Sequence, residues 1–143
     1  MINTLGVGII GCGNISAAYL ELSSMFKGYE IVAVADINME NANVRATEFN
    51  VRAETVDALL AATDVDLIIN LTIPAAHVEV SRAILQAGKH VYSEKPFVLS
   101  LAEAQELGAI AKENNLRIGS PSVRVCAPPR SSKPEATPPG AAL

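Results

Sequence analysis

Short apolar runs alternate along this chain with segments in which apolar residues recur every three or four positions. Runs of the first kind are typical of buried strands, and the recurring pattern is typical of amphipathic helices. Strands are predicted at residues 5–10, 30–35, 51–53, 65–71, 90–93 and 116–119. Helices are predicted at residues 15–26, 38–49, 56–61, 75–87 and 100–114. The alternation stops at about residue 120, which marks the end of the patterned part of the chain.

The order of these elements predicts an α/β fold. Alternating strands and helices build a parallel sheet with helices on both faces, and continuous apolar strands are typical of a sheet covered on both sides. Right-handed crossovers then favour a doubly wound sheet with strand order 3-2-1-4-5-6. Gly88 is suited to end the fourth helix, and Ser100 with Glu103 resembles a capping box that opens the fifth. The apolar face of the first helix is predicted to consist of Ile15, Ala18, Tyr19 and Leu22.

Composition narrows the class of protein. Half of the 143 residues are hydrophobic and 18% are charged, which is typical of a folded globular chain. The net charge is −4 and no Lys/Arg cluster is present, so nucleic acid is not an expected partner. No apolar run is long enough for a bilayer, and the first strand begins too early for a signal peptide. Cys12 and Cys126 have no metal-ligand spacing, so no metal is expected and a cytoplasmic location is the default prediction.

The end of the chain differs from the rest. Residues 121–143 hold six of the eight prolines and show neither helix nor strand periodicity. We therefore predict a patterned domain at residues 1–120 and a disordered Pro/Ala-rich tail at residues 121–143. A second hypothesis is that the tail is translated out of frame, which the other two reading frames of the coding DNA would test.

A glycine-rich turn lies between the first strand and the first helix. Gly11 allows a tight turn, Gly13 lets the backbone approach a ligand, and Ser16 is small enough for helix and strand to pack. The start of the helix at Asn14 and Ile15 then offers free N–H groups and the positive end of the helix dipole to an anion. This strand–turn–helix arrangement is typical of the pyrophosphate site in a Rossmann-like dinucleotide-binding fold.

An acidic residue follows at the end of the second strand. Asp36 lies 23 residues after Gly13 (36 − 13), where a carboxylate can accept both ribose hydroxyls of an adenosine and repel a 2′-phosphate. No Lys or Arg follows it directly, so the sequence favours NAD over NADP. The structural alternative is an ordinary strand-terminal Asp that starts a turn, with Asn38 capping the next helix.

Further candidates follow the fourth and fifth strands, at the edge where ligands collect in open α/β sheets. Thr72 and the turn at Pro74 are placed to pack against the cofactor, and His77 is a titratable group near the same edge. For His77 alone, a helix-start histidine bonded to local backbone is the favoured interpretation. Lys95 follows the fifth strand and is suited to take the hydroxyl proton of a substrate or to hydrogen-bond its alkoxide. The alternative is an ordinary Glu94–Lys95 pair in a loop.

Taken together, these segments resemble the N-terminal nucleotide-binding domain of the glucose–fructose oxidoreductase/inositol dehydrogenase/rhizopine-catabolism (Gfo/Idh/MocA) family. The matching segments are residues 8–16, 35–36, 72–74 with His77, 87–91 and 94–96. The resemblance implies that the glycine turn and Asp36 bind NAD(P), that Lys95 takes part in catalysis, and that the Lys95–Pro96 bond is a candidate for the cis form. The predicted cofactor site is Gly11, Gly13, Asn14, Ile15, Asp36, Thr72, Pro74, His77 and Glu94.

The resemblance also implies what this chain lacks. Family members oxidise or reduce sugars, cyclitols and related polyols, as dimers or tetramers. They continue into a C-terminal α/β domain that holds most of the substrate pocket, together with an Asp and a His of the catalytic set. Residues 121–143 match none of that domain, so we expect the family's C-terminal domain to be missing here and the chain alone to show little or no dehydrogenase activity.

Three other functions remain open from the sequence. A non-catalytic NAD-binding or redox-sensing module would need Gly13 and Asp36 but not Lys95. An S-adenosylmethionine methyltransferase also uses a glycine-rich first turn, although the Glu94–Pro96 segment and the position of Ser16 argue against it. A truncated product without a selected function is the third.

Overall fold

The computed structural model describes residues 3–121, so Cys126 and the two hypotheses about the tail lie outside the described residues. The strands in this part of the chain are β1 (Leu5–Ile10), β2 (Tyr29–Ala35), β3 (Arg52–Glu54), β4 (Leu67–Asn70), β5 (His90–Ser93) and β6 (Ile118–Gly119). Its helices are α1 (Asn14–Ser23), α2 (Met39–Phe49), α3 (Val56–Ala61), the short 3₁₀ helix η1 (Pro74–Ala76), α4 (His77–Gln86) and α5 (Leu101–Glu113). None of these helices is long and apolar enough to cross a membrane.

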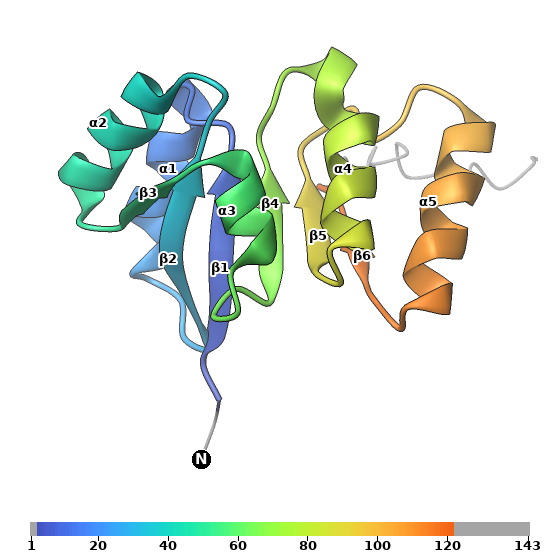
Figure 1. Ribbon diagram of the computed structural model, residues 1–143, viewed down its shortest axis with the longest axis horizontal. Helices are drawn as coiled ribbons and strands as arrows, with labels where there is room; N and C mark the ends of the chain where they lie inside the picture. The colour runs from blue at the N-terminus through green and yellow to red at the C-terminus, as the bar shows by residue number, and fades with distance from the viewer. Residues whose placement is uncertain (1–2, 122–143) are drawn as a thin grey trace, which may run out of the picture.

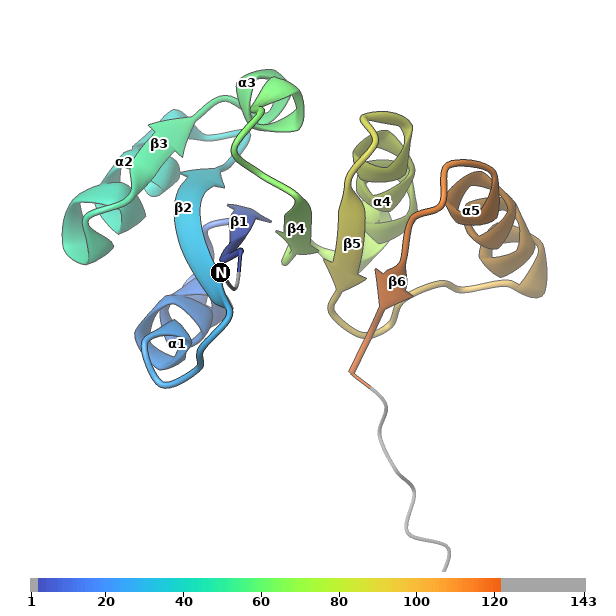
Figure 2. The ribbon, with the colours of Figure 1, turned by 90° about the horizontal axis from the view of Figure 1, so that it is seen from below.

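The strands form one parallel sheet in the order β3-β2-β1-β4-β5-β6, so the predicted fold class and topology are confirmed (Figure 1). Figure 2 shows α1 on one side of the sheet and α3, α4 and α5 on the other. The capping box at Ser100 and Glu103 is present, and Gly88 has the positive φ of +78° expected after a helix end. The sheet therefore separates two helical layers, as a doubly wound fold requires.

Each face of the sheet has its own apolar core. One core joins α3, α4 and α5 to the sheet, and its largest fully buried members are Leu59, Ile68, Ile84, Leu85 and Leu107. The other joins α1 and α2 to the opposite face, with Ile9, Leu20, Val34, Ala42 and Ala46 buried. Because helices pack against both faces, the positions of the strand ends at the carboxyl edge of the sheet are fixed by close packing.

The burial of α1 corrects one expectation. The predicted apolar face is wrong in phase, because Ile15 is 46% and Leu22 is 50% exposed while Ser16 and Leu20 are buried. The glycine turn sets the phase of α1. The Ser16 hydroxyl donates to the Gly13 carbonyl at 2.6 Å, and Ser16 is the small residue that faces the sheet. Close packing of the first turn therefore overrides the periodicity of the larger apolar residues.

Other differences concern element ends. The first helix ends at Ser23 rather than at residue 26, and the fourth strand is shorter than predicted. The helix predicted at residues 75–87 is divided into η1 and α4, because Pro74 opens a tighter turn at its N1 position.

Lys89 is the one buried lysine among the described residues, with 7% of its surface exposed. Its ammonium donates to the carbonyls of Ala62 at 2.6 Å and Val65 at 2.7 Å, and so ties the start of β5 to the loop before β4. Burial lowers the pKa of Lys89, although the charges of Asp66 and Asp64 oppose the shift. Lys89 is therefore a structural lysine on the side of the sheet away from the site described below.

Replacing Lys89 with methionine is expected to lower the free energy of unfolding by about 1–3 kcal/mol, because one buried carbonyl, of Val65, and one part-buried carbonyl, of Ala62, lose their donor. The native pKa of Lys89 lies below its unfolded value, so the unfolded chain binds more protons between the two values and wild-type stability rises with pH in that window. Urea unfolding of wild type and Lys89→Met at several alkaline pH values measures this dependence. The rise of the free energy of unfolding with pH should be absent in Lys89→Met. The exposed control Lys112→Met should keep it, and an equal loss in both variants would contradict the assignment.

Candidate functional site

The strand register brings four loops to one edge of the sheet. Ile10 pairs with Ala35 on one side and with Asn70 on the other, and Asn70 pairs with Ser93. The residues that follow these four positions therefore leave the sheet side by side, at the upper edge in Figure 1. This edge is where ligands bind in open α/β sheets.

Gly11 makes the turn that follows β1. Its φ is +104°, and a Cβ atom there would lie 2.6 Å from the Leu71 carbonyl carbon and oxygen. The Gly11 N–H donates to the Ala35 carbonyl at 2.9 Å, while the Leu71 N–H donates to the Ile10 carbonyl at 2.8 Å. The turn therefore sits against the loop after β4 in a space that only glycine fits.

The N-terminus of α1 faces open space. Gly13 is its N-cap, no side chain caps the helix within residues 3–121, and a Cβ atom at Gly13 would meet nothing within 4 Å. The first N–H groups of a helix have no partner inside it, so an uncapped end of a ten-residue helix can receive an anion. Asn14 and Ile15 are exposed at this end, as an anion site requires.

Arg45 on α2 braces the same turn. Its Nε donates to the Ser16 hydroxyl at 3.1 Å and its Nη2 to the Gly13 carbonyl at 3.4 Å, while Nη1 pairs with Glu48 at 2.6 Å. The Arg45 guanidinium thus adds positive charge beside the start of α1. It also holds the Gly13 carbonyl in place.

Asp36 is tied to the turn through both of its carboxylate oxygens. Oδ2 accepts the Cys12 N–H at 2.8 Å, and Oδ1 accepts the Asn38 N–H at 2.8 Å. A carboxylate has about four acceptor positions, so lone pairs remain for further hydroxyl donors. Burial and the Asp36 charge raise the pKa of the Cys12 thiol to about 11, so Cys12 stays a neutral thiol beside this carboxylate.

A pocket of about 590 Å³ opens beside these groups. Four of the predicted site residues line it: Gly11, Gly13, Asp36 and Thr72. The rest of its wall is largely apolar and comes from α3, the loop after β4 and α4, including Ile37, Val56, Leu60, Ile73, Ala76 and Val80. Three carboxylates, those of Asp36, Asp57 and Glu79, also line this largely apolar pocket. An apolar slot with polar groups at a few positions suits a flat base attached to a sugar.

The predicted Glu94–Pro96 segment follows β5 at the same edge. The Glu94 N–H donates to the Asn70 carbonyl at 3.1 Å, and its carboxylate accepts the Tyr19 hydroxyl and, at 3.1 Å, the Lys95 N–H. Burial and this hydrogen bond raise the pKa of Tyr19, which keeps the hydroxyl protonated as the donor. The Lys95–Pro96 bond is cis, as the resemblance implied, and Lys95 is exposed with no partner for its ammonium in the described chain.

The remaining predicted residues lie behind or beside the pocket. His77 is 2% exposed, and its ring nitrogens contact the Thr72 and Pro96 carbonyls at 2.7 Å each, so its ring is engaged by backbone. Pro74 begins η1 and is exposed. Thr72 is held by Asn70, whose Oδ1 accepts the Thr72 hydroxyl at 2.7 Å. The structure therefore brings Gly11, Gly13, Asp36 and Thr72 together, and places Glu94, Lys95 and His77 in the neighbouring turn and its support.

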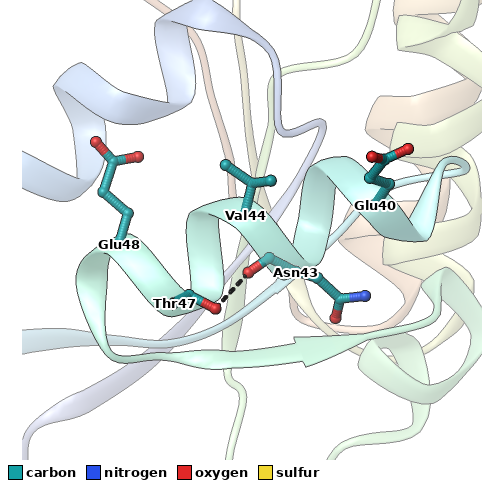
Figure 3. A pocket seen from close by; sticks show the side chains of 5 residues that line it. All are labelled: Glu40, Asn43, Val44, Thr47 and Glu48. Carbon is teal, nitrogen blue, oxygen red and sulfur yellow. Dashed lines mark hydrogen bonds between the residues drawn. The ribbon is translucent and has the colours of Figure 1, made fainter.

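A second hollow lies along the outer side of α2 (Figure 3). Its lining residues all come from that one helix: Glu40, Asn43, Val44, Thr47 and Glu48. The Thr47 hydroxyl donates to the Asn43 carbonyl at 2.9 Å, within the helix itself. Within residues 3–121 no second element lines this hollow, so it is an open helix face and does not compete with the pocket at the sheet edge.

Sequence reasoning missed Tyr19, Arg45 and Asn70. Tyr19 lies 75 positions from Glu94 and Arg45 lies 29 positions from Ser16, so no local spacing connects either pair. Asn70 could have been predicted as a structural residue of this edge. It ends an apolar strand, and a buried amide must find hydrogen-bond partners.

The fold and this edge together define a dinucleotide-binding Rossmann domain, and comparison with known proteins agrees. The profile of the Gfo/Idh/MocA oxidoreductase family, described as an NAD-binding Rossmann fold, matches residues 5–120. The chain therefore belongs to this family, and residues 5–120 correspond to its NAD-binding Rossmann domain.

Relatives and solved structures are similar over the same part. An inositol 2-dehydrogenase from Salmonella paratyphi B is 31% identical over 119 residues, covering 80% of this chain and 35% of that protein. The structure of GenD2 from gentamicin A biosynthesis, in complex with NAD, is 29% identical with a TM-score of 0.78, covering 84% of this chain and 35% of that one. The 3-ketoreductase KijD10 from Actinomadura kijaniata, in complex with NADP and TDP-benzene, is 30% identical with a TM-score of 0.78, covering 82% of this chain and 37% of that one. This chain thus spans about a third of the length of its relatives.

Proposed function

We propose that this chain binds NAD at the glycine turn and supplies the cofactor side of an oxidoreductase site for the CH–OH group of a sugar, cyclitol or polyol. The observation that carries the proposal is the uncapped start of α1 at Gly13, open to solvent and beside the Asp36 carboxylate. An anion fits the first feature and a ribose diol fits the second, and a dinucleotide carries both groups. The similarity to structures that contain NAD or NADP supports this placement.

Asp36 favours NAD over NADP in this proposal. Its carboxylate is fixed by two backbone N–H groups, so it cannot easily turn away from a 2′-phosphate. The next residue, Ile37, is 95% exposed and apolar, and offers no charge to such a phosphate. Arg45 is near, but its guanidinium nitrogens are already bound to Ser16, Gly13 and Glu48.

Lys95 is proposed as the catalytic residue. The cofactor supplies hydride acceptance or donation at its nicotinamide ring when bound. In its neutral form the Lys95 amine takes the hydroxyl proton of the substrate as the C–H bond breaks, and as an ammonium it hydrogen-bonds the developing alkoxide. The Glu94 carboxylate, held by the Tyr19 hydroxyl, accepts the Lys95 N–H and so fixes the backbone from which the Lys95 side chain extends.

Substrate contacts beyond Lys95 are proposed to come from outside residues 5–120. Lys95 is exposed. The pocket at the edge is lined by Asp36, the residue proposed to bind the adenosine ribose, and not by Lys95. Chemistry on a CH–OH group needs the reacting atoms to be enclosed and oriented. We therefore expect little or no turnover from this chain with a polyol panel, and robust turnover in a steady-state assay would contradict that expectation.

Gly13→Ala tests the proposed cofactor site without disturbing the fold. The added methyl meets nothing within 4 Å in the protein but occupies the space assigned to the pyrophosphate, so NADH binding should weaken about tenfold or more. Reduced-nicotinamide fluorescence measures the affinity, and circular dichroism checks the fold. Gly108→Ala, which also adds a methyl in open space, is the matched control and should bind as wild type does. Equal affinity in the two variants would rule out the glycine turn as the site.

A further inference from the structure

The Tyr19 hydroxyl makes the one hydrogen bond, within residues 3–121, between α1 and the turn after β5. Its acceptor is the Glu94 carboxylate, 75 positions further along the chain. The second oxygen of the same carboxylate accepts the Lys95 N–H at 3.1 Å. One carboxylate therefore joins a side chain of α1 to the backbone of Lys95.

This link crosses a part of the sheet that no described helix covers. In the strand order, β5 is two strands away from β1, which is about 10 Å at the usual spacing of about 4.8 Å. Figure 2 shows α1 below β1 and β2, and within the described chain no helix lies below β5 and β6. Tyr19 packs against the apolar core of this face and reaches the end of β5 from there. A side-chain hydrogen bond, rather than helix packing, thus connects α1 to the turn.

The other supports of the turn come from different elements. The Glu94 N–H donates to the Asn70 carbonyl at the end of β4, at 3.1 Å. The Pro96 carbonyl lies 2.7 Å from a ring nitrogen of His77, the first residue of α4. Without the Tyr19 hydroxyl, the turn would keep these two supports and lose its hydrogen bond to α1.

The proposed reaction needs α1 and the turn in register. The start of α1 is assigned to the cofactor pyrophosphate, and the turn carries Lys95. Displacing a reacting group by about 1 Å can cost about 100-fold in rate, so the distance between these two elements matters. Tyr19 lies five positions after Asn14, about 7.5 Å along the same rigid helix.

We propose that Tyr19 is a positioning residue that sets Lys95 relative to the cofactor and transmits occupancy of the phosphate site to the Lys95 turn. A phosphate held at the start of α1 restrains the helix, and the helix restrains Glu94 through the Tyr19 hydroxyl. The role toward Lys95 rests on the proposed function, whereas the link from Tyr19 through Glu94 to the Lys95 N–H does not.

Tyr92 provides a matched control for Tyr19. Burial and, after it, the charge of Glu94 raise the pKa of Tyr92, so this phenol lies near the same carboxylate. No hydrogen bond joins the Tyr92 hydroxyl to Glu94 among the described residues. Tyr92→Phe therefore removes a neighbouring hydroxyl and leaves the link intact, whereas Tyr19→Phe removes the donor itself.

The first test measures hydrogen exchange of the Lys95 amide by NMR in the ¹⁵N-labelled whole chain without ligand. Exchange should be several-fold faster in Tyr19→Phe and unchanged in Tyr92→Phe. In a Glu94→Ala background, Tyr19→Phe should add no further change, because its acceptor is already gone. An unaltered Lys95 amide in Tyr19→Phe, or an equal effect of Tyr19→Phe in the Glu94→Ala background, would overturn the link.

The second test is an amide NMR titration with ADP-ribose, which carries the adenosine and the pyrophosphate but no nicotinamide ring. In wild type and in Tyr92→Phe, the Asn14 and Lys95 amides should shift with the same Kd. In Tyr19→Phe the Asn14 shift should remain and the Lys95 shift should fall at least twofold. Glu94→Ala breaks the link from its other end, so the Lys95 response should also fall there.

The outcomes separate this proposal from the proposed function. If Asn14 responds to ADP-ribose but Lys95 shifts equally in wild type and Tyr19→Phe, or not at all in wild type, the transmission is wrong while the cofactor site stands. If Asn14 responds to neither ADP-ribose nor NADH, the proposed cofactor site is wrong and the transmission fails with it. In that case the exchange of the Lys95 amide still decides whether Tyr19 holds the turn.

Discussion

Replacing Asp36 with alanine is expected to weaken NADH binding about 100-fold and to remove the preference for NADH over NADPH. The carboxylate is proposed to accept the ribose hydroxyls, and hydrogen bonds to a charged group contribute about 1.5–3 kcal/mol each, where 1.4 kcal/mol corresponds to tenfold in affinity. The same substitution removes the charge that repels a 2′-phosphate, so NADPH should lose less affinity or gain some. Parallel titrations of both reduced cofactors by fluorescence measure the two effects.

Glu30→Ala is the matched control for Asp36→Ala. Glu30 is an exposed carboxylate on the same strand, β2, but it pairs with Gly6 near the amino ends of the strands. Its removal changes the net charge equally and should leave both affinities unchanged. A preference for NADH that survives in Asp36→Ala would contradict the role assigned to this carboxylate.

Gly11→Ala is expected to lower the free energy of unfolding by about 3 kcal/mol or more, through a positive φ and a steric clash together. A Cβ atom would lie 2.6 Å from the Leu71 carbonyl group and 2.9 Å from the Thr72 nitrogen, both backbone, so the loop after β4 must shift. Such a loss is a large part of the stability of an ordinary domain, about 5–15 kcal/mol. Urea unfolding followed by circular dichroism measures it.

Gly88→Ala and Gly108→Ala separate the two causes. Gly88 has a φ of +78° with nothing within 4 Å of an added Cβ, so its substitution adds only conformational strain. Gly108 lies within α5 with neither constraint, and alanine there should stabilise by about 1 kcal/mol. If Gly11→Ala unfolds at the same urea concentration as Gly88→Ala, the contact with Leu71 is not as tight as described.

Strand order and the edge that holds the site could be predicted from the sequence, because they depend on local pattern. Apolar runs gave the strands, right-handed crossovers gave the order, and parallel strands bring their carboxyl ends to one edge. Gly11, Gly13, Asp36 and Thr72 follow these strand ends and line one pocket. Whether that pocket binds NAD in preference to NADP stays a prediction, as does the cytoplasmic location.

Contacts between distant elements could not be predicted. The face of α1 that meets the sheet follows Ser16 rather than Ile15 and Leu22, since the glycine turn sets the phase of the helix before periodicity acts. The supports of the Lys95 turn, Tyr19 and His77, depend on how α1 and α4 pack against it. For these residues the sequence indicated a helical position but not the partner.

The most direct test of the central claim is an amide NMR titration of the ¹⁵N-labelled chain with NADH. A single saturable site should perturb the amides of residues 11–15, Asp36 and Thr72 first, and Gly13→Ala should reduce these shifts at the same subsaturating cofactor concentration. Absence of shifts in the folded chain up to about 1 mM NADH, a binding energy near −4 kcal/mol, would contradict the account. So would shifts confined to the outer face of α2, at Glu40, Val44 and Glu48 (Figure 3).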